Sequence, residues 1–228
     1  MIKIIYQGKD FKKIEKKISN AFNFIYKTFP IKTRDLTIRV YNNRNDFSER
    51  LGRKTEDWLV ALASDKEINI LSPDAIEKES NHNKKEFLQI LKHEFTHFFI
   101  SNFAKKKTIP KWLNEGLAAY VAGQHKNEKI FFTINGRFCK KLSTTKDWNN
   151  EVKKGAYTIS ATFVSYLIKK YSLKKIKELL VSMKKDYSYS DFKNTFINIY
   201  KINLEDAENI FIKNVSLDKY RKPANIST

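Results

Sequence analysis

The sequence predicts an α+β fold in which a small N-terminal mixed sheet with helices precedes a mostly helical C-terminal half. Two patterns predict this class. Short segments with alternating apolar residues are concentrated before residue 73. Segments with apolar residues at three- and four-residue spacing dominate from about residue 84 onward. The 228 residues suit one large domain or two small ones and are enough to bury a core.

Strands are expected where the alternation is clearest, at residues 2–6, 36–41, 58–64 and 67–72, the last two joined as a pair through Asp65 and Lys66. Asp10 is a plausible N-cap for a helix that ends before Pro30. A short helix over 43–52 is expected to end at Gly52, and Pro73 to close this part of the chain.

The remaining pattern is helical. A long helix is expected over residues 84–103, with its apolar face formed largely by phenylalanines, and another after Pro110 in "KWLNEGLAAYVAG". An extra strand is expected at 129–135. Further helices are expected at 157–171, 173–185, 190–199 and 204–214.

Composition excludes several classes of protein. The single cysteine, Cys139, rules out an intrachain disulfide and a cysteine-rich zinc cluster. The net charge of +19 comes from 44 Lys and Arg against 25 Asp and Glu, and the lysines are scattered in pairs and triplets. We therefore expect a solvated basic surface and no specific nucleic-acid partner, although a basic nucleic-acid-associated protein stays open as an alternative. No signal peptide or membrane span is visible, so we expect a soluble, cytoplasmic chain.

The segment "HEFTH" places His93 and His97 four residues apart within the long predicted helix. Residues at this spacing share one helix face, so two imidazole nitrogens can meet one metal ion. Glu94 lies one position further round, which suits a general base acting on metal-bound water. The alternative is a polar stripe on a core helix.

A third ligand is expected from the next helix, because a catalytic zinc takes three protein ligands and an open position. Glu115 in "WLNEGLAAY" follows His97 after 17 intervening residues, which is enough for the first helix to end and the next to return. The small residues after Glu115 would let the two helices approach closely. The alternative is a capping or surface glutamate.

Together, "HEFTH" and "KWLNEGLAAY" resemble the gluzincin zinc metallopeptidases, in particular peptidase-MA-like domains related to aminopeptidase N. The resemblance implies a thermolysin-like catalytic domain in which His93, His97 and Glu115 bind Zn²⁺. It implies that metal-activated water hydrolyses peptide bonds, with Glu94 as the general base. The expected partner is a peptide or protein substrate. A catalytically silent or very narrow-client zinc-binding protein that uses its cleft for recognition stays open.

A third similarity lies in "AYTISATFVSYLIKKYS", which resembles the segment that carries the oxyanion-binding tyrosine of aminopeptidase-N relatives. The resemblance gives this second catalytic role to Tyr157. The alternatives are an ordinary aromatic at a helix start, or His125 or His82 as the donor. Asn114 is a candidate for orienting a metal-binding imidazole.

One departure concerns substrate choice. Aminopeptidases of this kind carry a Gly-x-Met-Glu-Asn strand whose glutamate binds the substrate amine, and "WLVALASDKEINIL" lacks it. Glu67 is the only carboxylate in "EINIL", and strand alternation does not direct it to the site. A strand able to pair with an extended substrate remains.

The expected organisation is one compact catalytic unit. Residues 1–83 form an N-terminal α/β part with the substrate-side strands, and residues 84–221 form the active-site helix and a helical subdomain. The active-site cleft lies between these parts, and residues 222–228 form a loose tail.

Overall fold

The computed structural model describes residues 2–218 except 7, 9, 32–34, 106, 125–136, 184 and 187. The chain divides into two compact units. Unit 1 comprises Met1–Lys106 and Leu117–Asn127, and unit 2 comprises Lys107–Gly116 and Glu128–Thr228. The strand expected at 129–135 and the tail at 222–228 lie outside the described residues, and the expected division at residue 83 stays a prediction.

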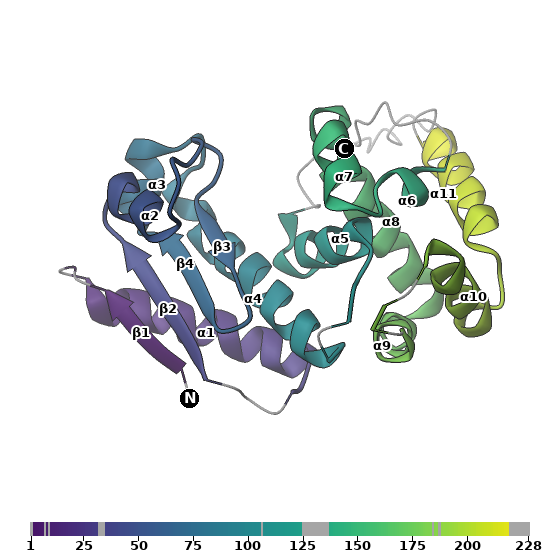
Figure 1. The fold of residues 1–228 in the computed structure, drawn as a ribbon, viewed down its shortest axis with the longest axis horizontal. Coiled ribbons are helices and arrows are strands. Elements are labelled where there is room, and N and C mark those ends of the chain that lie inside the picture. The colour runs from purple at the N-terminus through teal and green to yellow at the C-terminus, as the bar shows by residue number, and fades with distance from the viewer. Residues whose placement is uncertain are drawn as a thin grey trace, which may run out of the picture. The chain divides into compact units, whose positions relative to one another are not determined.

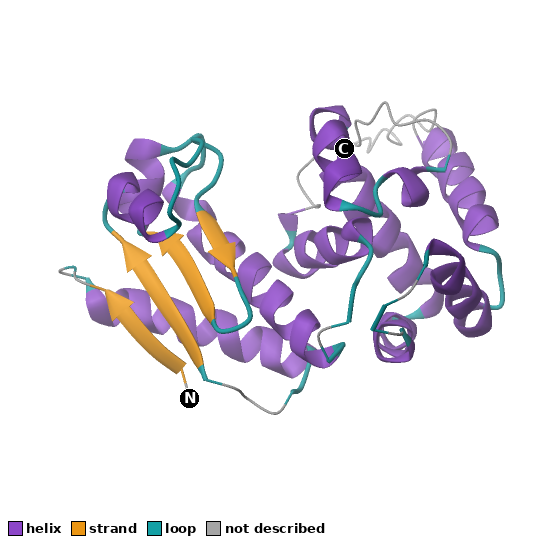
Figure 2. Cartoon of the chain, in the orientation of Figure 1, coloured by secondary structure: helices purple, strands orange, loops and turns teal. Residues whose placement is uncertain are grey.

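Unit 1 contains a four-stranded mixed sheet with the order β1-β2-β4-β3 (Figure 2). The strands are β1 (Ile2–Tyr6), β2 (Leu36–Tyr41), β3 (Ala61–Ala63) and β4 (Glu67–Leu71). β1, β2 and β4 run parallel, and β3 pairs antiparallel with β4 at one edge. Along β2, buried Leu36, Ile38 and Val40 alternate with half-buried residues, which confirms the predicted alternation.

The helices of unit 1 are, in chain order, α1 (Phe11–Thr28), α2 (Arg44–Arg50), α3 (Pro73–Glu79), the 3₁₀ turn η1 (Lys84–Glu86) and α4 (Phe87–Phe103). α1 and α4 pack against each other behind the sheet (Figure 1). Phe22 of α1 joins them, because its ring meets those of Phe95 and Phe99 edge-on at 5.7 and 5.1 Å between centroids.

α5 (Lys111–Ala122) is shared by the two units, since the division falls between Gly116 and Leu117. The rest of unit 2 is helical in its described residues: α6 (Phe138–Lys141), α7 (Thr145–Glu151), η3 (Val152–Lys154), α8 (Ala156–Tyr171), α9 (Leu173–Ser182), α10 (Tyr189–Tyr200) and α11 (Leu204–Asp218). Phe163 of α8 is fully buried at the centre of this core, in contact with the rings of Trp112, Phe138 and Phe211.

The predicted mixed α+β class is confirmed, with differences in detail. Pro73 is the first residue of α3, a position where its missing N–H is not needed for a helical hydrogen bond. The sequence had instead predicted that Pro73 closes the N-terminal part of the chain. β3 spans three residues instead of seven. Asp10 precedes α1 as expected, but its side chain makes no capping hydrogen bond. None of the helices in the described ranges has both the length and the apolar character needed to cross a membrane.

Candidate metal centre

α4 presents a polar patch on an otherwise buried helix. Phe95, Phe98 and Phe99 are at most 2% exposed and hold the helix in the core of unit 1, as predicted. His93 and His97 project from the half-buried side, one turn apart, with ring centroids separated by 4.7 Å. The core therefore fixes the helix, and the helix fixes the spacing of the two imidazoles.

Glu115 lies on α5 and is only 4% exposed. Its Oε1 accepts a hydrogen bond from Lys111 Nζ at 2.6 Å, one helical turn earlier. A buried carboxylate needs such a partner, because desolvation without compensation is costly. The surface or capping glutamate that the sequence left open does not fit this burial.

The close approach of α5 to α8 depends on the residue after Glu115. A Cβ atom added to Gly116 would lie 2.6 Å from the carbonyl oxygen of Ser160 on α8. Real side-chain carbons do not approach backbone that closely, so only glycine permits this packing. The position of Glu115 is thus tied to helix packing within unit 2.

The structure brings three of the predicted site residues together. His93, His97 and Glu115 each offer one ligand atom, and these atoms lie within 4.8 Å of one another. Two imidazole nitrogens and one carboxylate oxygen form the donor set of several catalytic zinc sites. The side chains present therefore fit a divalent transition metal.

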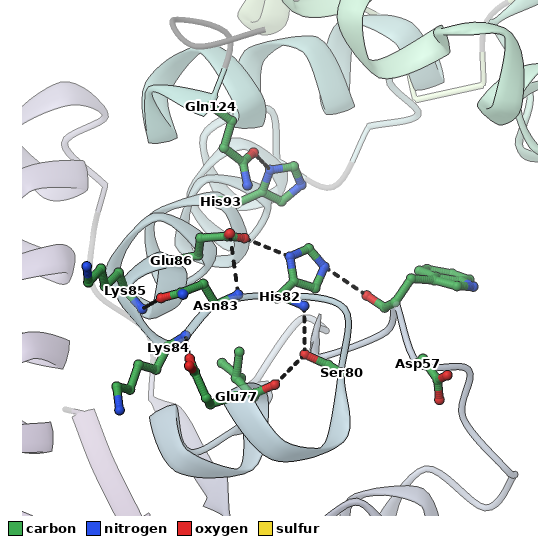
Figure 3. Close-up of polar contacts among 12 residues, drawn as sticks. Asp57, Glu77, Ser80, His82, Asn83, Lys84, Lys85, Glu86, His93 and Gln124 are labelled. Carbon is green, nitrogen blue, oxygen red and sulfur yellow. Dashed lines mark hydrogen bonds and ion pairs between the residues drawn. The ribbon is translucent and has the colours of Figure 1, made fainter.

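Gln124, which the sequence analysis missed, orients one of the imidazoles. Its Oε1 lies 2.8 Å from Nδ1 of His93 (Figure 3). An amide oxygen only accepts, so His93 donates from Nδ1 and its Nε2 carries the lone pair that a metal requires. No periodic pattern identifies Gln124, because the contact joins residues 31 positions apart. Asn114, the expected candidate, is half-buried on α5 and stays a prediction.

Glu94 is half-buried on α4, directly after His93. Within the described part of the chain, its carboxylate makes no hydrogen bond or ion pair, in contrast to Glu115. A carboxylate without a competing partner remains available as a proton acceptor.

The other sequence candidates have separate surroundings. Tyr157 is 39% exposed in the first turn of α8, where its ring meets Trp148 edge-on at 4.9 Å. His82 is engaged by Glu86 at 2.8 Å and by the carbonyl of Trp58 at 3.3 Å (Figure 3). His125 lies outside the described residues.

Glu67 is committed to arginines of its own unit. Its carboxylate accepts hydrogen bonds from Arg39 Nε and, at 2.8 Å, from Arg50 Nη2. Burial raises the pKa of this carboxyl group, but the hydrogen bonds from the two arginines outweigh burial and lower the pKa overall. Glu67 is therefore a structural ion-pair residue of β4.

A buried carboxylate beside two histidines spaced by one helical turn, on an α+β scaffold, offers three donor atoms that one metal ion can share. The sequence matches the family model of the peptidase MA superfamily over residues 31–215 and belongs to that superfamily. Its function is accordingly of the metallopeptidase type. The comparison with curated proteins gives no match.

Proposed function

We propose that this chain is a zinc-dependent peptidase of the gluzincin type, related to aminopeptidase N, in which His93, His97 and Glu115 hold the metal. The observation that carries the proposal is the convergence of the three ligand atoms within 4.8 Å, with Glu94 next to the first histidine. The superfamily is generally zinc-dependent, which supports the choice of metal.

The bound zinc would supply Lewis acidity, lowering the pKa of water and polarising the substrate carbonyl. The residues of the chain do the rest. Glu94 accepts a proton from the attacking water and delivers it to the leaving amine. Gln124 holds the His93 ring in the orientation and tautomer that leave Nε2 for the metal.

Tyr157 is the proposed donor to the oxyanion that forms when water attacks the carbonyl. A phenol O–H supplies a hydrogen bond that strengthens as negative charge develops on this oxygen. Its 39% exposure at the start of α8 is compatible with a donor that meets substrate.

The proposed substrate is an extended polypeptide. β3 is the edge strand next to β4, and an edge strand offers unpaired backbone groups to a peptide. Leu62 of β3 is 39% exposed and Trp58, just before it, is 62% exposed, so apolar surface lies beside this edge. Because Glu67 is held by arginines, capture of a free amino terminus by that residue is not proposed.

The test measures zinc content and cleavage of a mixed library of unfolded peptides in parallel, for the wild type and Glu94→Gln. The matched control is Glu49→Gln, an equivalent change at an exposed position on α2. We expect about one zinc per chain in all three proteins. Cleavage should fall by two orders of magnitude or more, roughly, in Glu94→Gln alone.

Three results would refute parts of the proposal. A wild-type protein that binds no zinc at micromolar concentration would remove the metal assignment. Zinc binding without cleavage by any of the three proteins would leave a recognition module instead of a peptidase. Undiminished cleavage by Glu94→Gln would assign the base to another residue.

A further inference from the structure

Unit 1 contains a surface cavity of about 320 Å³, open to solvent, that plays no part in the proposed peptide hydrolysis. Lys13 and Lys17 of α1 line it together with Lys84 and Lys85 of η1. We call it the lysine cavity. The four lysines come from segments about 70 residues apart, so the fold, and not a local run of charge, brings them together.

The four ammonium groups form no ion pair with any residue that the structure describes. Among the described residues, none of them has a carboxylate within 4.0 Å. Lys17 lies over the ring of Phe87 at 5.6 Å, and the side chains of Lys84 and Lys85 point away from His93 (Figure 3). Lys13, Lys84 and Lys85 are exposed and Lys17 is half-buried, so solvent screens most of the repulsion among the four charges, and a bound anion would offset the rest.

The rest of the lining is polar and moderates the charge. Asp10 and Asp74 also border the cavity, which leaves it a formal charge of +2. Tyr6 completes the polar wall with its phenol. Burial, then Asp10 and Asp74, raise the pKa of Tyr6, so its O–H remains a hydrogen-bond donor throughout the neutral range.

The cavity lies where parallel sheets commonly bind ligands. β1 ends at Tyr6 and β4 ends at Leu71, two residues before Pro73, so the carboxyl ends of two parallel strands lead into its wall. α1, an 18-residue helix, begins beside it with no acidic residue in its first turn and no side-chain cap. Its N-terminal partial charge adds to that of the lysines.

We propose that the lysine cavity binds a compact phosphate-bearing anion, separate from the metal centre. Lysines act on phosphate as point charges from several directions, whereas a carboxylate is best matched by the planar fork of arginine, which the lining lacks. The volume exceeds what one phosphate fills and falls at the lower end for small-molecule ligand sites, which favours a diphosphate or a small phosphate ester.

The experiment is calorimetric titration of the full chain with inorganic pyrophosphate, at about 0.15 M salt to suppress general attraction. The cavity variant is Lys13→Gln/Lys17→Gln. Its matched control is Lys12→Gln/Lys16→Gln, which removes the same charge from the same helix at positions outside the lining. Because Lys17 also contacts Phe87, a second cavity variant, Lys84→Gln/Lys85→Gln, tests the other wall. Circular dichroism verifies that each variant is folded.

We expect saturable binding by the wild type and the control, and a loss of about tenfold or more in both cavity variants. Equal weakening in the control would show general attraction to a basic surface and overturn the proposal. Absence of saturable binding would do the same. Citrate, a carboxylate anion of comparable charge, should bind more weakly, and equal binding would overturn the phosphate assignment. None of these results depends on zinc binding or cleavage.

Discussion

Gln124 lies outside the predicted motifs and contacts the candidate metal centre. Its amide oxygen meets Nδ1 of His93 at 2.8 Å and sets which imidazole nitrogen is free. Partners of this kind change metal affinity by about 10- to 100-fold when they are removed.

We therefore expect Gln124→Ala to weaken zinc binding by about 10- to 100-fold, and Gln124→Glu, which retains an acceptor oxygen, to weaken it much less. Competition with a chromogenic chelator measures both. The matched control is Gln89→Ala, a half-buried glutamine on α4 without a hydrogen bond to the described residues. Equal affinities of Gln124→Ala and the control would show that the contact does not orient the ring.

Glu208 on α11 is a second residue with a measurable signature. It is 2% exposed, Oε1 accepts a hydrogen bond from the Cys139 N–H at 2.7 Å, and Oε2 has no hydrogen-bond partner among the described residues. Burial raises the pKa of this carboxyl group from 4.5 to about 7. The folded chain therefore holds a proton that the unfolded chain releases above pH 4.5, and ionisation at higher pH opposes folding.

The contribution of Glu208 to the free energy of unfolding should be greatest below pH 4.5 and lost as the pH rises to about 7. The slope is at most about 1.4 kcal/mol for each pH unit. Urea unfolding between pH 5 and 7, roughly that window, should show a smaller decrease for Glu208→Gln than for the wild type. Glu178→Gln is the control, since the hydrogen bond from Lys175 lowers the pKa of that carboxyl group and its charge is not among the causes of the Glu208 shift. Identical slopes in all three proteins would contradict the prediction.

The residues with an internal sequence pattern were those that sequence could predict. His93, Glu94 and His97 share one helical spacing, and Glu115 stands among small residues that make a surface role unusual. Gln124 carries no such pattern. Its contact joins it to His93, 31 positions earlier, and depends on where α5 ends in the folded chain.

At the level of elements, α5 packs tightly against α8 at Gly116. A methyl group there would overlap the carbonyl of Ser160, and backbone cannot move aside as a flexible side chain can. Overpacking of this kind costs about 1–3 kcal/mol.

We expect Gly116→Ala to lower the free energy of unfolding by about 1–3 kcal/mol and also to weaken zinc binding, because Glu115 is the preceding residue. Chemical denaturation and chelator competition measure the two effects. Gly52→Ala is the control. Gly52 has open space around it but a φ of +65°, which alanine adopts only with strain. This substitution should therefore lower stability without changing metal affinity. If Gly116→Ala is less stable but binds zinc as tightly as the wild type, the packing at Gly116 does not determine the position of Glu115.

The long helices were predicted from their periodicity, whereas three of the short helices were not. The seven-residue α2 was predicted, over 43–52 with its end at Gly52. α1, α4 and α8 extend over at least 16 residues, and their apolar spacing identified them. α3, α6 and α7 have at most seven residues, too few to establish a helical period. At α3, Pro73 was interpreted as a terminator, although Ser72 caps a helix that begins there.

For the whole molecule, the surplus of positive charge is the dominant electrostatic feature. A net charge of +19 disfavours the compact state through self-repulsion, and salt screens that repulsion. Raising sodium chloride from about 0.02 to 0.2 M should raise the Tm by roughly 2–4 °C, equivalent to about 1 kcal/mol. Calorimetry at neutral pH measures the shift. A decrease in Tm would show that attractive pairs such as those of Glu67 outweigh the repulsion.

The division of α5 between two compact units limits how this chain can be cut. Unit 1 takes residues from both sides of the Lys107–Gly116 segment, so it is discontinuous in sequence. Any single break in the gene therefore leaves one product short of part of a unit, and cutting near residue 116 would also split a helix in two. A truncation made to isolate the sheet of unit 1 would therefore also remove part of α5. We therefore expect the two units to be inherited and expressed together, as one unit that recombination does not divide.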